Sequence, residues 1–106
     1  MPQIELAGVT YEVDEDGFLQ ELDKWSESFA RAYASAEEIE GELTEDHWRI
    51  IHYLRNYFQQ FGIAPMVRKL CKDNKIDMKR LYELFPTGPA KGACKLAGLS
   101  KPTGCV

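Results

Sequence analysis

This sequence of 106 residues lacks several features that would place a protein in a membrane or outside the cell. Residues 1–5 have neither the basic start nor the apolar run of a secretory signal. No apolar stretch approaches the roughly 18–20 residues that a membrane-spanning helix needs. Cysteine occurs only three times, too rarely for a dense disulfide framework. We therefore expect a cytoplasmic protein, not embedded in a membrane, whose cysteines serve thiol chemistry or metal binding.

Acidic residues are scarce in one half of the chain. Residues 1–46 contain 14 acidic and 2 basic residues, whereas residues 47–106 contain 3 acidic and 11 basic ones, although the net charge is only −4. Two interpretations stay open. The two halves could neutralise each other within the fold, or the basic half could attract an anionic partner.

Apolar residues make up 44% of the chain and aromatic residues 11%, enough for one domain with its own core. Near the start, apolar and polar residues alternate over residues 4–6 and 9–13, with Ala7-Gly8 between them. This pattern predicts a small β-hairpin. Because an isolated hairpin is only marginally stable in water, we expect it to pack on helices.

Helical spacing of apolar residues indicates about five helices between residues 18 and 85. The stretch 18–34 can be divided at residues 23–26, with Ser26 capping the second part. A central helix starts after Thr44 and ends at Gly62. Further helices are expected from Pro65 and after Asp77. The residues expected to face inward in these three helices are Trp48, Ile50, Ile51, Leu54, Tyr57, Phe58 and Phe61; Met66, Val67, Leu70 and Cys71; and Met78, Leu81, Tyr82 and Phe85.

The composition changes after Phe85. Residues 86–106 contain four glycines, three prolines and three lysines but no acidic residue. We divide the single domain into a body of residues 1–86 and a C-terminal arm of residues 87–106. Residues 90–99 can form a short helix, whereas residues 100–106 have almost nothing to bury and are expected to be mobile.

Two cysteines lie in this arm, and Cys105 is the penultimate residue of the chain. A terminal thiol on a mobile segment contributes little to packing but can enter a cleft of another protein. Lys101 and Lys95 supply positive charge that favours the reactive thiolate, and the terminal carboxylate partly offsets it. We therefore identify Cys105 and Cys94 as the candidate reactive residues.

Cys94 lies eleven positions before Cys105, with Gly98, Pro102 and Gly104 between them. Fully extended, this segment spans roughly 36 Å. Since a disulfide requires Cα atoms about 4.4–6.8 Å apart, the arm must fold back to form one. Closing such a loop costs on the order of 3 kcal/mol of chain entropy, little enough to be reversible. The arm can therefore be extended, offering Cys105, or retracted and closed as a Cys94–Cys105 disulfide.

Several other interpretations of these residues stay open. The disulfide could be static, and Cys71 could be a third redox thiol, although its helical spacing is typical of a core residue. His47 and His52 could bind zinc, but their i,i+5 spacing is poor for a shared site, and we expect no metal. A helix-turn-helix DNA-binding regulator is an alternative from another class, because helices near 44–61, 65–74 and 77–85 could form this motif. Six residues there are basic: Arg68, Lys69, Lys72, Lys75, Lys79 and Arg80. The acidic pI of about 5.2 argues against a nucleic-acid partner.

The arm closely resembles that of a known family. It carries two motifs, Gly88-Pro89-Ala90-Lys91-Gly92-Ala93-Cys94-Lys95-Leu96-Ala97-Gly98-Leu99 and Lys101-Pro102-Thr103-Gly104-Cys105-Val106. Both are similar to the C-terminal arm of the DsrC family, the dissimilatory sulfite reductase gamma subunits and TusE-related sulfur carriers. The resemblance extends to residues 16–19, 48–58 and 65–70. Ser100 stands where the family commonly has proline, which loosens the arm slightly and leaves both thiols in place.

The resemblance implies a mainly α fold: a compact bundle of about five helices with a helix-turn-helix-like core, a small N-terminal β-hairpin and a flexible C-terminal arm. It also implies that Cys105 carries sulfur as a persulfide or trisulfide and that Cys94 is its partner. No other cofactor is implied. Such a chain is a co-substrate more than an enzyme.

Members of the family with both cysteines are associated with dissimilatory sulfur metabolism. For these members the resemblance implies dissimilatory sulfite reductase, sulfur-donor proteins and a disulfide reductase complex as partners. TusE-like members keep only the penultimate cysteine and relay sulfur toward tRNA 2-thiouridine. Because this chain has both cysteines, we favour the first branch. Arg68 and Lys69 are candidate partner-binding residues, or they could pair with the acidic residues of positions 35–46.

Overall fold

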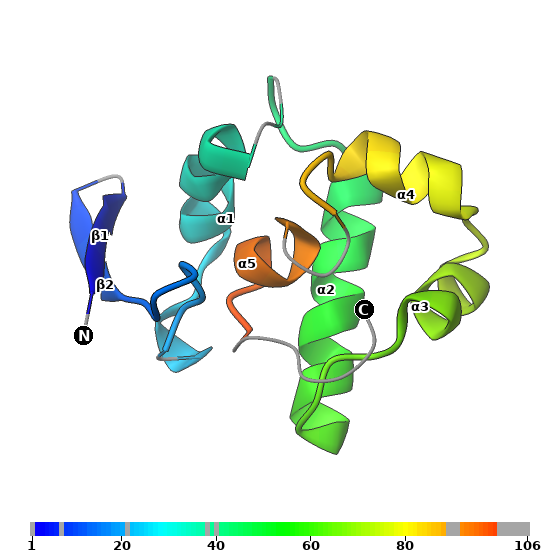
Figure 1. The fold of residues 1–106 in the computed structure, drawn as a ribbon, viewed down its shortest axis with the longest axis horizontal. Coiled ribbons are helices and arrows are strands. Elements are labelled where there is room, and N and C mark those ends of the chain that lie inside the picture. The colour runs from blue at the N-terminus through cyan, green and yellow to red at the C-terminus, as the bar shows by residue number, and fades with distance from the viewer. Residues whose placement is uncertain are drawn as a thin grey trace.

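The computed structural model describes residues 2–6, 8–20, 22–37, 39, 41–88 and 92–99. Within them the fold is mainly helical, with one two-stranded hairpin, as the sequence predicts. Figure 1 shows the hairpin at one end of the molecule and helices α3 and α4 at the other, with α1, α2 and α5 between them. None of the described helices is long and apolar enough to cross a membrane.

The hairpin consists of antiparallel strands β1 (Gln3–Leu6) and β2 (Val9–Glu12), in which Leu6 pairs with Val9. The predicted hairpin is thus confirmed. Tyr11 is buried and packs edge-on against Phe29, with ring centroids 4.9 Å apart. This contact attaches the hairpin to the helical body, whereas Val9 remains 49% exposed.

The helix expected from Phe18 does not form. The Asp14 side chain instead accepts hydrogen bonds from the backbone N–H groups of Asp16 and Phe18, and Leu19 forms a bridge with Val13. Phe18 and Leu19 are both buried in this extended conformation. Helical structure starts only with the short 3₁₀ helix η1 (Leu22–Lys24). Residues 18–20 instead pair with the end of the hairpin, because Asp14 N–H donates to Phe18 O and Gln20 N–H donates to Glu12 O.

The predicted caps of the next two helices are confirmed. Ser26 accepts from Phe29 N–H and starts α1 (Glu27–Ala34), which continues into the 3₁₀ helix η2 (Ser35–Glu37). Thr44 caps the central helix α2 (Glu45–Phe61). Gly62, at φ +73°, ends α2 in the left-handed conformation that glycine adopts without strain.

Helix α3 (Val67–Asn74) and helix α4 (Met78–Leu84) are short, and Asp77 caps α4 as predicted. Pro65 precedes α3 by two residues instead of starting it. Leu70, Leu81 and Phe85 are buried, but the expectation was wrong for four apolar residues that are 43–60% exposed. These residues are Phe61, Met66, Met78 and Tyr82. Three of them stand at helix ends, where the apolar spacing extends beyond the turns that face the core: Phe61 is last in α2, Met66 is the N-cap of α3 and Met78 is first in α4.

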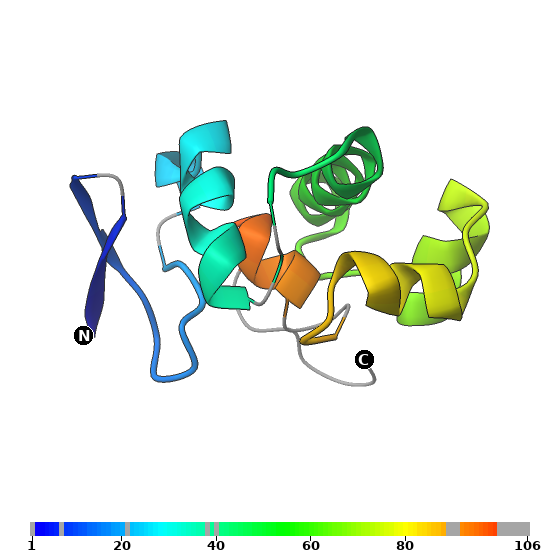
Figure 2. The same ribbon diagram turned by 90° about the horizontal axis from the view of Figure 1, so that it is seen from above.

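The short helix α5 (Cys94–Leu96) lies between α1 and α2, as both ribbon views show (Figures 1 and 2). Apart from the half-buried Lys95, its residues and their neighbours are buried almost completely: Ala93, Leu96, Ala97 and Leu99 each have 0% exposure. Residues 92–99, which the sequence analysis placed in the arm, are therefore part of the core. Their apolar side chains fill the space between two helices that would otherwise lose their packing partner.

Candidate functional site

Cys94 is a core residue at the start of α5, with 2% of its surface exposed. Burial raises the pKa of its thiol to about 12, because a thiolate would lose its solvation there. At neutral pH the residue is therefore protonated, and external reagents cannot reach it in this conformation.

Cys105 lies outside the described residues, as do Lys101, Pro102 and Gly104. Of the predicted reactive pair, the structure therefore describes Cys94 and its surroundings. The assignment of Cys105 as the sulfur-bearing residue stays a prediction.

Gly98 ends α5 and is packed tightly. At φ +71° it adopts the left-handed conformation, and its N–H bonds Lys95 O while Leu99 N–H bonds Cys94 O. These two bonds form a Schellman motif, a common helix ending. A Cβ atom at Gly98 would lie only 2.5 Å from Cδ1 of Trp25. Gly98 is thus needed for the turn and for the approach of Trp25.

Two side chains from distant parts of the sequence bind the last carbonyl groups of this segment. Trp25 Nε1–H donates to Leu96 O over 2.7 Å, and Arg55 Nη1 donates to Ala97 O over 2.8 Å. The Arg55 guanidinium also lies over the Trp25 ring, 4.2 Å from its centroid. We call Trp25 and Arg55 the α5 clamp. No short sequence motif marks either residue, since the contacts span 71 and 42 positions.

Lys95, the other described lysine of the predicted site, is half-buried. Its Nζ lies over the Phe18 ring, 5.4 Å from the centroid. Gly17, at φ +92°, leaves room for the Tyr33 hydroxyl, which donates to Gly17 O and would lie only 2.6 Å from a Cβ at this position. Lys95 therefore links α5 to the turn that follows the hairpin.

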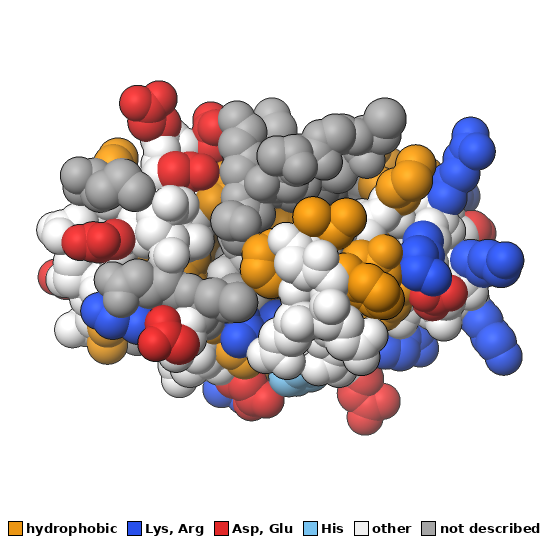
Figure 3. All heavy atoms as spheres, turned by 90° about the horizontal axis from the view of Figure 1, so that it is seen from below, with side chains coloured by type: hydrophobic (Ala, Val, Ile, Leu, Met, Phe, Trp, Pro, Cys, Tyr) orange, Lys and Arg blue, Asp and Glu red, His pale blue; other side chains and the backbone are white. Residues whose placement is uncertain are grey.

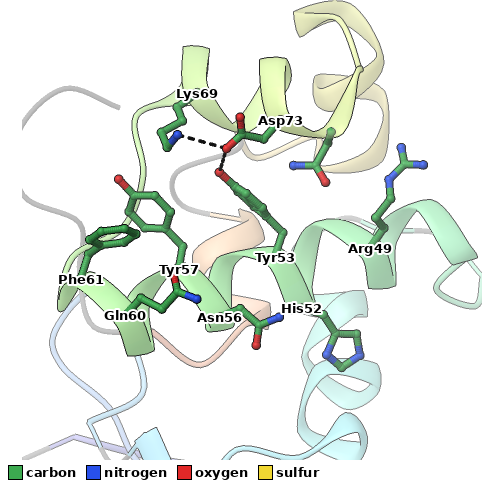
Figure 4. Close-up of a pocket in the computed structure, with 10 residues that line it drawn as sticks. Arg49, His52, Tyr53, Asn56, Tyr57, Gln60, Phe61, Lys69 and Asp73 are labelled. Atoms are coloured by element: carbon green, nitrogen blue, oxygen red, sulfur yellow. Dashed lines mark hydrogen bonds and ion pairs between the residues drawn. The ribbon is translucent and has the colours of Figure 1, made fainter.

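The candidate partner-binding residues Arg68 and Lys69 are exposed on α3. Lys69 forms an ion pair with Asp73 over 3.2 Å, and it pairs with none of the residues that the structure describes within positions 35–46. Asp73 also accepts a hydrogen bond from the Tyr53 hydroxyl, and burial and this bond together raise the pKa of Tyr53. An open groove of about 630 Å³ lies between α2 and α3. Figure 4 shows these groups among the residues that line it.

Positive charge is concentrated at the α3–α4 end. Arg68, Lys72, Lys75 and Lys79 are all exposed there. Figure 3 shows this end rich in Lys and Arg on one face, whereas the opposite, hairpin end carries more Asp and Glu. The two halves of the sequence therefore do not simply cover each other, although Arg80 pairs with Asp46 over 3.0 Å.

The remaining candidates occupy separate places. Cys71 is half-buried, and burial raises its pKa, with a smaller contribution from Asp77. His47 is buried at the start of α2, whereas His52 is exposed and stacks on Trp48. Within the described ranges no three His, Cys, Asp or Glu residues are grouped so that they could hold a metal ion.

A family model described as DsrC like protein matches residues 5–106. The chain belongs to this DsrC-like family. The chain is 48% identical, over the full length of both proteins, to the sulfite reductase, dissimilatory-type subunit gamma of Nitratidesulfovibrio vulgaris. It is 40% identical to the sulfurtransferase TusE homolog of Haemophilus influenzae, covering 97% of this chain and 99% of the relative.

Solved structures of DsrC proteins share the fold. The oxidized gamma subunit of the dissimilatory sulfite reductase (DsrC) from Archaeoglobus fulgidus superposes with a TM-score of 0.87 at 47% identity, covering 99% of this chain and all of that one. DsrC of Allochromatium vinosum gives a TM-score of 0.83 at 47% identity, covering 98% of this chain and 97% of that one. The predicted fold class is thus confirmed.

Proposed function

We propose that this chain is a cytoplasmic sulfur-carrier protein of dissimilatory sulfur metabolism. Cys105 carries sulfur to or from dissimilatory sulfite reductase, and Cys94 resolves the sulfur-loaded state. The observation that carries this proposal is the presence of both arm cysteines in a chain that is 48% identical, end to end, to a dissimilatory-type gamma subunit. The sulfur is held covalently, so the carrier needs no separate cofactor.

The proposed resolving step conserves atoms and electrons. Cys94 loses its proton to solvent, and its thiolate attacks Sγ of the Cys105 persulfide. A Cys94–Cys105 disulfide forms, the sulfur–sulfur bond of the persulfide breaks, and hydrosulfide leaves. The persulfide is the oxidant in this step. A disulfide reductase complex then supplies two electrons and two protons to restore both thiols.

Sulfur loading followed by intact-mass measurement tests the roles of the two cysteines. A low-molecular-weight persulfide should add one sulfur atom, about 32 Da, to the wild-type chain and to the Cys94→Ala variant. Cys105→Ser should remain unloaded, and Cys94→Ala should not form the intramolecular disulfide. Cys71→Ala is the control and should behave as wild type. Full loading of Cys105→Ser would contradict the assignment.

The second candidate is a TusE-like relay of sulfur toward tRNA, which the 40% identity to a TusE homolog favours. The two functions differ in their need for Cys94. A relay needs only the terminal thiol, so Cys94→Ala should retain tRNA thiolation in cells that depend on this protein. In the dissimilatory function the same variant should load sulfur but stall before hydrosulfide release. Sulfite reductase genes beside the gene for this protein would support the dissimilatory function.

A further inference from the structure

The proposed role of Cys94 as a resolving thiol conflicts with its buried position. The resolving step needs a thiolate that can meet Cys105, yet Cys94 is 2% exposed and protonated at neutral pH. Either α5 shifts or Cys94 takes no part in the chemistry. The contacts that hold α5 in place therefore decide when the thiol becomes available.

Helix α5 has little stability of its own. It comprises three residues, and an isolated helix shorter than about 12 residues is marginal in water. The last carbonyl groups of a helix lack partners within it. Here Leu96 O and Ala97 O are bound by Trp25 and Arg55. Burial and these two hydrogen bonds hold the segment between α1 and α2.

The two clamp residues also depend on each other. The guanidinium of Arg55 lies over the ring of Trp25 at 4.2 Å, so each restricts the other's side-chain orientation. Trp25 additionally packs against Gly98, where no Cβ atom would fit. Loss of either donor removes a hydrogen bond from a carbonyl group of the buried 96–97 segment, which favours an open state of α5.

We propose that Trp25 and Arg55 are positioning residues that keep Cys94 enclosed and thereby control its release for reaction with Cys105. This proposal rests on the sulfur-carrier function for its purpose, but not for its test. The resting carrier keeps its resolving thiol out of reach of stray oxidants. Opening of the α5 clamp exposes Cys94 and lets its thiol ionise at the pH of solution.

Native-state alkylation measures this opening directly. In a Cys105→Ser background, only Cys71 and Cys94 remain to react with iodoacetamide, and peptide mass spectrometry separates the two. Arg55→Gln should increase the rate at which Cys94 is alkylated by about tenfold or more, because a charged donor is lost. Trp25→Phe keeps a ring beneath Arg55 but removes the N–H donor, and should increase the rate about fivefold.

The chain offers a matched control for Arg55. Arg31 lies over the other tryptophan, Trp48, 5.3 Å from the ring centroid. Arg31→Gln removes the same kind of cation–π contact at the α1–α2 interface, and the described partners of Arg31, Trp48 and Glu27, both lie outside α5. It should leave the Cys94 rate within about twofold of the background. Arg55→Lys restores a cationic donor and should recover part of the protection.

The dependence on urea separates clamp opening from general loss of stability. For a local opening, Cys94 alkylation in Arg55→Gln should be nearly independent of low urea concentrations, since little surface is exposed. If Cys94 reacts only in step with global unfolding, or if Arg31→Gln accelerates it equally, the proposal is overturned. Either result would leave Cys105 as the proposed sulfur-bearing residue. Sulfur loading of the Cys105→Ser variant would instead contradict the proposed function and would not affect the proposal on the α5 clamp.

Discussion

The imidazole of His47 joins the start of α2 to the end of α4. Its Nε2 donates to Leu84 O over 2.8 Å, and its Nδ1 accepts from Thr44 N–H over 3.0 Å. A carbonyl oxygen can only accept and an amide N–H can only donate, so these partners select the neutral tautomer with the proton on Nε2. His47 thereby completes a capping box with Thr44.

This arrangement predicts that the protein loses stability in mildly acidic solution. The pKa of His47 is lowered from 6.5, chiefly by burial; Arg80 lowers it further, and the Leu84 hydrogen bond and Asp46 partly oppose the shift. The unfolded chain therefore takes up a proton before the folded one does. The contribution is fully present above about pH 6.5 and is lost as the pH falls through the lowered value.

Urea unfolding between pH 5 and 8 tests this expectation. The wild type should show a falling midpoint below about pH 6.5, and His47→Gln should show a flatter profile. His52→Gln removes an exposed imidazole from the same helix and serves as the matched control. An unchanged pH dependence in His47→Gln would exclude His47 as its source.

The turn at Gly98 gives a second prediction, with an internal control. Gly98→Ala introduces a Cβ both into a left-handed conformation and 2.5 Å from Trp25, whereas Gly62, at φ +73°, has open space around it. Gly62→Ala should cost only the conformational strain, about 1 kcal/mol. Gly98→Ala should cost roughly 1–3 kcal/mol more because the Trp25 contact must shift. Equal losses in urea unfolding would contradict the packing role of Gly98.

The burial of Cys94 predicts that serine is a poor substitute for it. Cys94→Ser places a hydroxyl group in a site surrounded by apolar residues and should destabilise the fold by about 1–3 kcal/mol more than Cys94→Ala. Cys71 is half-buried, so its serine and alanine variants should differ much less. The urea unfolding midpoints of the serine and alanine variants of Cys94 and Cys71 test this prediction. Similar midpoints for both Cys94 variants would mean that the site accommodates a polar group.

Local signals explain which parts of the fold could be predicted from the sequence. Ser26, Thr44, Asp77 and Gly62 act on backbone groups within a few residues, and the structure places each as a cap. The helix expected from Phe18 did not form because residues 18–20 pair with residues 12–14, and the Asp14 side chain closes the turn between these two segments. The spacing of apolar residues alone cannot show which of these two local structures is the more stable.

Local sequence signals predicted the candidate site only in part. Cys94 was found because it stands in a distinctive motif. The burial of Cys94 was not predicted, because it depends on where α1 and α2 place residues 92–99. Trp25 and Arg55 were missed for the same reason, since their contacts with residues 96 and 97 exist only after the chain has folded.

Lys75 provides the last prediction, because it is the single non-glycine residue with positive φ in the part of the chain that the structure describes. At φ 53° and ψ 47° it ends α3, and its N–H bonds the carbonyl groups of Cys71 and Lys72. This left-handed conformation costs about 1–2 kcal/mol for a residue with a side chain. Glycine avoids most of the cost, so Lys75→Gly should raise the free energy of unfolding by up to about 1 kcal/mol.

Lys72→Gly is the appropriate control, since it removes the same charge from within α3. There glycine should lower the free energy of unfolding by about 1 kcal/mol, because the residue has a right-handed helical conformation. Opposite signs in urea unfolding would show that the backbone conformation, and not the lost charge, determines both effects. If both variants lost stability, the Lys75 side chain would have to contribute more through its contacts than its backbone conformation costs.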